Sequence, residues 1–218
     1  LEIKLSFITG LREIVLHEIA QHEELHIIRE KEDSLYLDFT DLDVIKHLRS
    51  VARAYVVVQD SAYNPPYISK HKSIIGNLLE IAMGENAKAF KTFKITCAGS
   101  DSREVRDIAQ YIQKTYGLVE KEDADMKVHI IKLGEIWEVG AQITPRPLSF
   151  RDYKVKNMSG AMDPTIAYAM NSLCNLENAS SYLNIFSGSA TLLIEAGQCY
   201  PNIQQLIGFD NNKKNISL

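Results

Sequence analysis

The stretch from Ser181 to Asp210 constrains the fold of this chain more than any other part of the sequence. Residues 181–186 form a short, largely apolar run with the length of a buried strand, and the apolar run that begins at Leu192 has the character of a helix. Small residues join the two runs, and a second strand-like run over 205–209 ends on Asp210. The order strand, turn, helix, strand is typical of a doubly wound α/β fold.

The same stretch has the features of a nucleoside-cofactor site. Small residues let a backbone approach a ligand closely, and the N-terminus of the helix offers N–H groups. Asp210 lies about 20 residues beyond Gly188, the separation at which a doubly wound fold places a carboxylate beside a ribose. A plain strand-to-helix turn is the alternative, because a dinucleotide fingerprint has three glycines and Ala190 stands where the second is usual.

Composition excludes several other classes of protein. With 45% hydrophobic and 24% charged residues, the chain of 218 residues resembles an ordinary globular protein of one large or two small domains. No apolar run approaches the roughly 20 residues that span a bilayer, and no signal peptide opens the chain. Three widely separated cysteines indicate neither a disulfide framework nor a metal site. We therefore expect a cytoplasmic protein without a membrane partner or a metal.

Residues 1–63 are predicted to form a ferredoxin-like N-terminal module. Strand-like runs are expected over 3–8, 25–29, 34–39 and 54–59, and helices over 11–21 and from Thr40 or Asp41 to Arg49. The resulting β-α-β-β-α-β order is the ferredoxin-like pattern. Nothing in this range indicates catalysis, and its histidines stand among charged neighbours, as surface or structural residues do.

Residues 64–146 are predicted to form a second, small α/β domain. The sequence Asn64-Pro65-Pro66 marks a stiff joint before it. We expect helices over 67–83 and 102–116, the latter opened by Asp101 or Ser102 and closed by Gly117, and a strand over 91–98. Two alternating runs joined at Gly134 predict a hairpin-like pair of strands.

Residues 147–218 are predicted to form a linker and the first part of a third domain. The linker is basic with interleaved aromatic residues from Leu148 to Lys156, as in an RNA-facing segment. Asp163 is expected to cap a helix that begins with Pro164 and leads into the βαβ-like stretch.

Basic residues of the second and third ranges are candidate contacts to RNA phosphates, although a solvated charged face is the simpler interpretation for any single one. The chain as a whole has a formal charge of −4, so such contacts require local basic patches. The candidates are Lys70, Lys72, Lys91, Lys94, Arg103, Arg106, Arg146, Arg151, Lys154 and Lys156.

Three blocks give the sequence a more specific resemblance. They match, in order, the blocks found in THUMP-containing RNA methyltransferases at the entrance to their catalytic domain. In this sequence the blocks are residues 151–156, 160–165 and 184–196. In that family the glycine block commonly reads Asp-Pro-Phe-Cys-Gly-Ser-Gly-Thr before an Ile-Glu-Ala-type helix. Here the block reads Asn-Ile-Phe-Ser-Gly-Ser-Ala-Thr over 184–191, followed by Ile-Glu-Ala over 194–196.

The resemblance implies a ferredoxin-like module, a THUMP domain that binds RNA, and the start of a Rossmann-like domain that uses S-adenosylmethionine. By this resemblance Asp210 accepts hydrogen bonds from the ribose hydroxyls of the cofactor. The other residues implied to line the cofactor pocket are Pro164, Thr165, Asn184, Phe186, Ser187, Gly188, Ser189, Ala190 and Thr191. Asn184 stands where the family has an acid, and Ala190 where it has a glycine.

The resemblance also implies a part of the catalytic domain that we do not find in the sequence. The target-base motif of the family, Asn/Asp-Pro-Pro-Tyr/Phe, does not follow Asp210, so the catalytic residues are not assigned. The letters Asn-Pro-Pro-Tyr over 64–67 fall in the joint before the second domain, where we interpret them as a structural look-alike. We expect a truncated or incomplete catalytic domain, and a chain that is inactive by itself.

Three functions remain as hypotheses. The first is methylation of a base in structured RNA, most readily guanine N2 of tRNA or rRNA, with S-adenosylmethionine as the methyl donor. The second is a non-catalytic RNA-binding module with a degenerate methyltransferase domain. The third is a nicotinamide-dependent enzyme, against which the single glycine of the turn argues.

Overall fold

A computed structural model of the chain describes residues 1–60, 68–97, 102–154 and 160–212. These residues divide into two compact units, each built from separate stretches of sequence. Unit 1 contains residues 1–6, 23–47 and 53–147, and unit 2 contains residues 7–22, 48–52 and 148–218. The joint over 64–67 lies largely outside the described residues, so the three predicted domain ranges remain a prediction.

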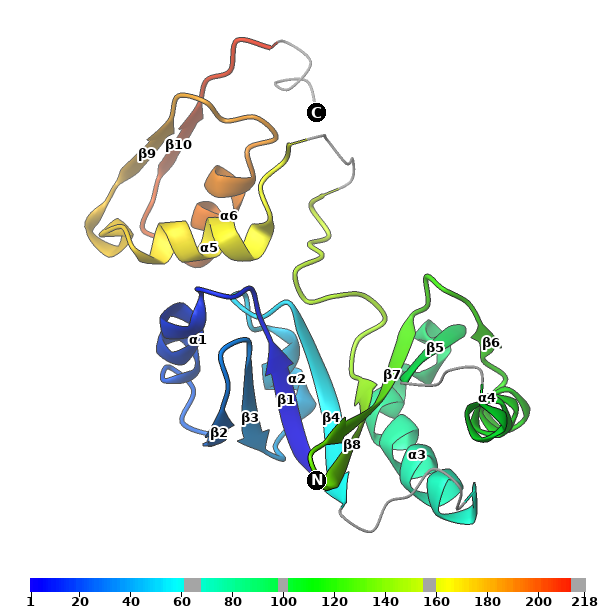
Figure 1. Ribbon diagram of the computed structural model, residues 1–218. Coiled ribbons are helices and arrows are strands. Elements are labelled where there is room, and N and C mark those ends of the chain that lie inside the picture. Colours follow the sequence, from blue (N-terminus) through cyan, green and yellow to red (C-terminus); the bar gives the residue numbers. More distant parts are fainter. Residues whose placement is uncertain (61–67, 98–101, 155–159, 213–218) are drawn as a thin grey trace. The chain divides into compact units, whose positions relative to one another are not determined.

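Unit 1 is a mixed α/β structure around one mostly antiparallel sheet of eight strands (Figure 1). The strand order is β2-β3-β1-β4-β8-β7-β5-β6. The strands are β1 (Glu2–Ser6), β2 (Ile27–Glu30), β3 (Ser34–Asp38), β4 (Arg53–Asp60), β5 (Thr92–Cys97), β6 (Val119–Glu120), β7 (Met126–Leu133) and β8 (Ile136–Gln142). The pairing of β4 with β8 joins strands that the sequence analysis assigns to two different domains.

The helices of unit 1 begin and end where the sequence predicts capping residues. Asp41 accepts a hydrogen bond from the N–H of Asp43 and caps α2 (Leu42–Lys46), which ends three residues before the expected Arg49. Ser102 caps α4 (Arg103–Tyr116), and Gly117 closes that helix in the left-handed conformation. The remaining helical segments are α3 (Ile68–Met83) and the 3-10 segment η1 (Gly84–Ala89).

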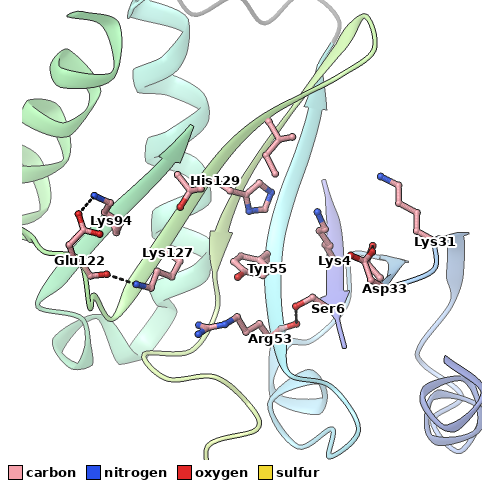
Figure 2. Close-up of a pocket in the computed structure, with 13 residues that line it drawn as sticks. Lys4, Ser6, Lys31, Asp33, Arg53, Tyr55, Lys94, Glu122, Lys127 and His129 are labelled. Carbon is pink, nitrogen blue, oxygen red and sulfur yellow. Dashed lines mark hydrogen bonds and ion pairs between the residues drawn. The ribbon is translucent and has the colours of Figure 1, made fainter. Parts of the chain in front are cut away.

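Strand register gives the sheet of unit 1 one apolar and one polar face. Ile3 pairs with Val56, Val56 with Ala141, and Ala141 with Val128, and all four side chains are buried. Because α3 contacts β4 and β8, this is the face that helices cover. Lys4 and Tyr55 point to the opposite face, beside His129 of β7 (Figure 2).

A buried carboxylate ties five strands together on the polar face. Glu138 of β8 has no solvent exposure. Its oxygens accept hydrogen bonds from Lys4 Nζ at 2.7 Å, Tyr36 Oη at 2.8 Å, Gln59 Nε2 at 2.9 Å and His129 Nε2 at 3.1 Å. These bonds hold the pKa of Glu138 well below its ordinary range, so the group is an anion and His129 Nε2 carries the donated hydrogen.

A glycine makes room for this network. His129 lies opposite Gly140 in the β7–β8 pair, and a Cβ at position 140 would come within 2.6 Å of His129 Nε2. The same Cβ would come within 2.8 Å of Val57 Cγ1. The imidazole therefore reaches Glu138 across the bare backbone of Gly140.

Unit 2 contains helices and a two-stranded parallel sheet. Its elements are α1 (Arg12–Ile19), α5 (Pro164–Ser172), the 3-10 segment η2 (Leu176–Asn178), β9 (Ser181–Asn184), α6 (Thr191–Cys199) and β10 (Gln205–Gly208). Asp163 caps α5 with Pro164 in its first turn, as the sequence predicts. Helix α5 packs against α6, and a small core of Leu176, Ala196 and Ile203 lies in the same unit.

The polar network predicts that acid destabilises the protein through His129. Burial lowers the pKa of His129 below its ordinary value of 6.5, although Glu138 opposes the shift. Above pH 6.5 the contribution of His129 to the free energy of unfolding is complete. As pH falls from 6.5 toward the lowered pKa, this contribution is lost, because His129 takes up a proton in the unfolded state before it does so in the folded state. We expect His129→Gln to flatten the loss of unfolding free energy between pH 7 and pH 5, where one group contributes at most about 1.4 kcal/mol per pH unit.

Urea unfolding at both pH values measures this loss. His26→Gln is the matched control because His26 is an exposed histidine of the same unit. A pH dependence that is the same in His129→Gln as in the parent would contradict the assignment.

Candidate functional site

The predicted cofactor stretch folds as strand, turn, helix and parallel strand. Ser181 of β9 pairs with Gln205 of β10, and Asn184 with Gly208, in parallel register. Helix α6 connects the two strands, so both strands end at the same edge of the sheet. Ligands of open α/β sheets bind at this edge, outside the carboxyl ends of the strands.

The structure brings Asp210 to the glycine turn. Asp210 Oδ2 accepts a hydrogen bond from the backbone N–H of Gly188 at 2.9 Å, and Oδ1 accepts one from the N–H of Asn212 at 2.8 Å. The turn is also fixed by a hydrogen bond from Ser187 N–H to the carbonyl of Phe209. The sequence analysis places Asp210 beside the ribose of a cofactor, and that role remains a prediction.

Close packing explains a second glycine at the site. Gly208 ends β10 beside the turn, and a Cβ there would lie 3.0 Å from the Cβ of Ser187 and 2.9 Å from Leu193 Cδ1. Contacts this short leave no space for a side chain. The glycine therefore allows the end of β10 to approach the turn and the first part of α6.

Ala190 holds an unusual backbone conformation at the start of α6. Among the described residues it is the one non-glycine residue with a positive φ, at 58°. It occupies the N-cap position of α6, where its side chain accepts no hydrogen bond. The left-handed conformation costs an L-residue roughly 1–2 kcal/mol, a cost that glycine does not incur.

The other cofactor candidates are held by local hydrogen bonds. Asn184 Oδ1 accepts the N–H of Phe186 at 3.1 Å, and the Phe186 side chain is 84% exposed. Ser189 Oγ and Thr191 Oγ1 lie 3.1 Å apart. Pro164 and Thr165 are buried in the first turn of α5, where the Thr165 hydroxyl donates to Asp163.

This arrangement fits a nucleoside cofactor. A carboxylate accepts hydrogen bonds, as a partner of ribose hydroxyl groups must, and Asp210 lies beside the turn. The small side chains of the turn leave its backbone accessible for close approach.

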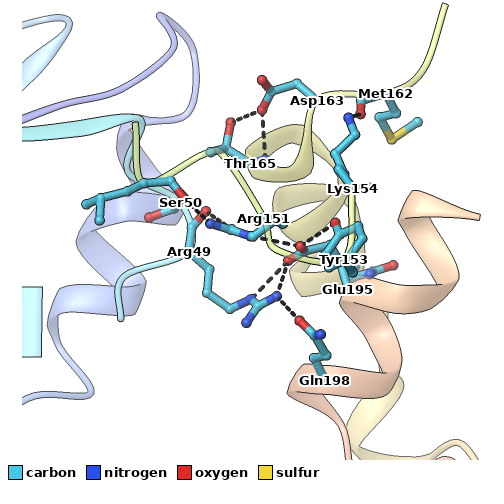
Figure 3. Close-up of polar contacts among 12 residues, drawn as sticks. Arg49, Ser50, Arg151, Tyr153, Lys154, Met162, Asp163, Thr165, Glu195 and Gln198 are labelled. Atoms are coloured by element: carbon cyan, nitrogen blue, oxygen red, sulfur yellow. Dashed lines mark hydrogen bonds and ion pairs between the residues drawn. The ribbon is translucent and has the colours of Figure 1, made fainter. Parts of the chain in front are cut away.

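The most buried polar cluster of unit 2 centres on Glu195 (Figure 3). The Glu195 side chain has no solvent exposure. Its Oε1 accepts hydrogen bonds from Arg151 Nε at 2.9 Å and Tyr153 Oη at 2.7 Å, and its Oε2 accepts one from Arg49 Nε at 2.9 Å. Gln198 accepts a further hydrogen bond from Arg49. The Glu of the Ile-Glu-Ala sequence thus organises the linker around α6.

Arg151 is corrected from an RNA contact to a structural residue. Its side chain is only 10% exposed and forms an ion pair with Glu195. Its Nη2 also donates to the carbonyl of Arg49 at 2.8 Å, and its Nη1 to the carbonyl of Leu148. A guanidinium enclosed in this way does not face a phosphate backbone. Nearby, Lys154 Nζ donates to the carbonyl of Met162 at 3.0 Å.

A second buried carboxylate supports the same cluster. Glu18 of α1 accepts hydrogen bonds from the backbone N–H groups of Arg49 and Ser50 at 2.7 and 2.8 Å. These bonds fix the segment 48–52, from which Arg49 extends to Glu195. The apolar surroundings of Glu195 in the sequence were the available signal for a buried acid, but its partners lie more than 40 residues away.

Several of the remaining RNA candidates lie on the surface of unit 1. The exposed candidates are Lys72, Lys91, Arg103, Arg106 and Arg146. Lys94 pairs with the exposed Glu122. The side chain of Lys70 and the whole of Lys156 lie outside what the structure describes.

Two other kinds of site were considered. Within the described ranges no group of three His, Cys, Asp or Glu side chains is placed to hold a metal ion. No helix in these ranges is long and apolar enough to cross a membrane.

Comparison with known proteins points to methyltransferases. Residues 151–216 match the UPF0020 family, described as an RMKL-like methyltransferase domain. A tRNA (guanine(6)-N2)-methyltransferase of Thermus thermophilus is 27% identical over 114 residues, which is 52% of this chain and 34% of that protein. The family match covers the glycine turn, Asp210 and Glu195.

Solved structures share the fold. TrmN from Thermus thermophilus aligns with a TM-score of 0.70 and 18% identity, covering 99% of this chain and 67% of its own. SMU.472, complexed with SAH, aligns with a TM-score of 0.58 and 17% identity, covering 90% of this chain and 55% of its own. The chain thus spans about a third of the curated relative and between half and two thirds of these structures.

The Glu195 cluster predicts a strong effect of charge removal on stability. Glu195→Gln leaves two partly buried guanidinium groups without their anion, for which we expect a loss of about 3–5 kcal/mol. Denaturant unfolding monitored by circular dichroism measures the loss. Glu177→Gln, an exposed acid of the same unit, is the control and should change stability by less than about 0.5 kcal/mol. Similar stabilities of the two variants would exclude a central role for the cluster.

The strained turn predicts a stabilising substitution. Ala190→Gly relieves the positive φ, and we expect thermal unfolding to show a gain of about 1 kcal/mol. Ala179→Gly provides a matched comparison, because Ala179 has a φ of −89° at which alanine is unstrained. That variant should lose stability, and a loss in both variants would refute the strain argument.

Proposed function

We propose that this chain is the cofactor-binding part of an S-adenosylmethionine-dependent tRNA methyltransferase that modifies guanine N2. The observation that carries the proposal is the Asp210–Gly188 contact at the edge of two parallel strands, within the range that matches a methyltransferase domain. The tRNA (guanine(6)-N2)-methyltransferase of Thermus thermophilus supports the choice of substrate.

Each part of the turn has a role in this proposal. Asp210 accepts hydrogen bonds from the ribose hydroxyls of the cofactor, and the small side chains of Ser187 and Ser189 allow the backbone to approach it. Phe186, exposed beside the turn, covers the cofactor and excludes water. Thr165 and Pro164 stabilise the start of α5, which packs on α6.

When bound, S-adenosylmethionine would supply an electrophilic methyl group on a sulfonium, which the guanine amine would accept with loss of a proton and release of the neutral thioether. The residues of this chain contribute position rather than acid–base chemistry. The turn fixes the orientation of the cofactor, and orientation of two reactants accounts for several kcal/mol of a transfer barrier.

RNA binding is assigned to the first two predicted domains, the ferredoxin-like module and the THUMP domain. The exposed candidates for phosphate contacts in this proposal are Lys72, Lys91, Arg103, Arg106 and Arg146. A cytoplasmic location follows from a tRNA substrate.

A non-catalytic RNA-binding module is the second candidate. The observation that favours it is the hydrogen bond from Phe186 N–H to the Asn184 side chain, which occupies the position of the family's acid with a neutral group engaged in its own turn. Cofactor titration distinguishes the candidates, because a module of this kind has no affinity for S-adenosylmethionine.

The proposal predicts that Asp210 is needed for cofactor affinity. In the full-length protein we expect Asp210→Ala to weaken S-adenosylmethionine binding by about tenfold or more, because charged hydrogen bonds contribute about 1.5–3 kcal/mol. Isothermal titration calorimetry measures the affinity. Asp210→Asn retains an acceptor for Gly188 N–H but loses the charge, and therefore separates binding from folding of the turn.

Asn211→Ala, a change at an exposed neighbour, is the control and should bind as the parent does. Unchanged affinity in Asp210→Ala would refute the assignment of this residue. A parent protein that binds no cofactor and transfers no methyl group to an unmodified tRNA transcript would refute the proposed activity.

A further inference from the structure

The polar face of the unit 1 sheet contains a cavity of about 660 Å³ (Figure 2). All of its lining residues belong to unit 1, and they come from β1, β3, β4, β5 and β7 and from loops beside these strands. Five of its lining side chains are cationic: Lys4, Lys31, Arg53, Lys94 and Lys127. Only Lys94 belongs to the basic set that the sequence analysis selected.

The cavity is positively charged within an acidic chain. Its five cations are accompanied by two carboxylates, those of Asp33 and Glu122, while the whole chain has a net charge of −4. A concave surface with an excess of positive charge concentrates the electrostatic potential and attracts polyanions.

Three of these cations are held in place by uncharged groups. Lys31 Nζ donates to the hydroxyl of Tyr36 at 3.3 Å, and Arg53 Nη1 donates to Gln142 Oε1 at 2.7 Å. Lys127 Nζ donates to the backbone carbonyl of Glu122 at 2.8 Å. These bonds orient the side chains without neutralising their charge. Lys4, in contrast, pairs with the buried Glu138.

The distribution of these charges favours an extended ligand. Figure 2 shows Lys31 and Lys127 on opposite sides of Tyr55, with Arg53 at a third position. A single phosphate ion does not span such a set, whereas successive phosphates of a strand do. Tyr55 packs edge to face with His129 at 5.0 Å and provides an aromatic floor, as single-stranded nucleic-acid sites often have.

We propose that this cavity binds the phosphate backbone of the RNA substrate through Lys31, Arg53 and Lys127. The inference rests on the proposed function for the identity of the RNA, and it adds a contact surface on the sheet face. Three hydroxyl side chains also line the cavity, those of Ser6, Ser34 and Thr96.

The test is RNA binding by the triple variant Lys31→Gln/Arg53→Gln/Lys127→Gln of the full-length protein. Fluorescence anisotropy with a labelled, unmodified tRNA transcript gives the Kd across a range of KCl concentrations. We expect the Kd to rise by about tenfold or more, and the slope of log K against log salt to become less negative by about two to three, since each lost phosphate contact changes it by about 0.7–0.9.

The matched control removes the same charge elsewhere on unit 1. Lys114, Lys121 and Lys132 are exposed and do not line the cavity. The variant Lys114→Gln/Lys121→Gln/Lys132→Gln should bind tRNA within about threefold of the parent, because general electrostatic attraction falls only slightly. Equal losses in the two triple variants would overturn the proposal.

A single substitution keeps the test valid if the triple variant is unstable. Lys127→Gln removes a side chain that bonds a backbone carbonyl, and we expect a two- to fivefold weaker Kd with a slope change of about one. An unchanged Kd and slope in this variant would also overturn the proposal.

Two further measurements separate this inference from the proposed activity and from other polyanions. Cofactor affinity should be unchanged in the triple variant, because the turn at Gly188 belongs to unit 2. Weakened tRNA binding in a protein without cofactor affinity would support the cavity and refute the methyltransferase. Displacement of the tRNA by inorganic phosphate or polyglutamate as readily as by unlabelled RNA, at equal charge concentration, would overturn the assignment to RNA.

Discussion

The antiparallel pairing of β4 with β8 is the interaction on which the architecture of unit 1 depends. It continues the sheet from strands near the start of the chain to strands more than 80 residues later. Because β8 lies between β4 and β7, Glu138 can accept hydrogen bonds from Lys4 and Tyr36 on one side and from His129 on the other. The same pairing places Arg53 and Lys127 around a common cavity.

Features determined by neighbouring residues could be predicted from the sequence. Helix caps depend on local backbone chemistry, and each is found where it was expected. They are the N-caps Asp41, Ser102 and Asp163 and the left-handed Gly117. The strand, turn, helix and strand around Gly188 were also predictable, because a short apolar run and a run of small residues indicate them directly. Helix boundaries were less certain, as the early end of α2 at Lys46 illustrates.

Features determined by long-range pairing could not be predicted in the same way. Arg151 has the pattern of an RNA-facing residue in a basic, aromatic segment, yet Glu195 and the carbonyl of Arg49 enclose it. The cavity cations extend from Lys4 to Lys127 in sequence, and strand register alone brings them together. A pattern of charge along a sequence does not record which strands become neighbours.

The division of the chain into interleaved units has a consequence for cutting or exchanging parts of this protein. Glu195 lies inside the stretch that matches the methyltransferase domain, but one of its two guanidinium partners, Arg49, lies far upstream and is fixed by Glu18. A fragment that begins at residue 148 retains the glycine turn and Asp210 but leaves a buried carboxylate half-neutralised. Transplanting the catalytic part into another scaffold therefore requires α1 and residues 48–52 to be transferred with it.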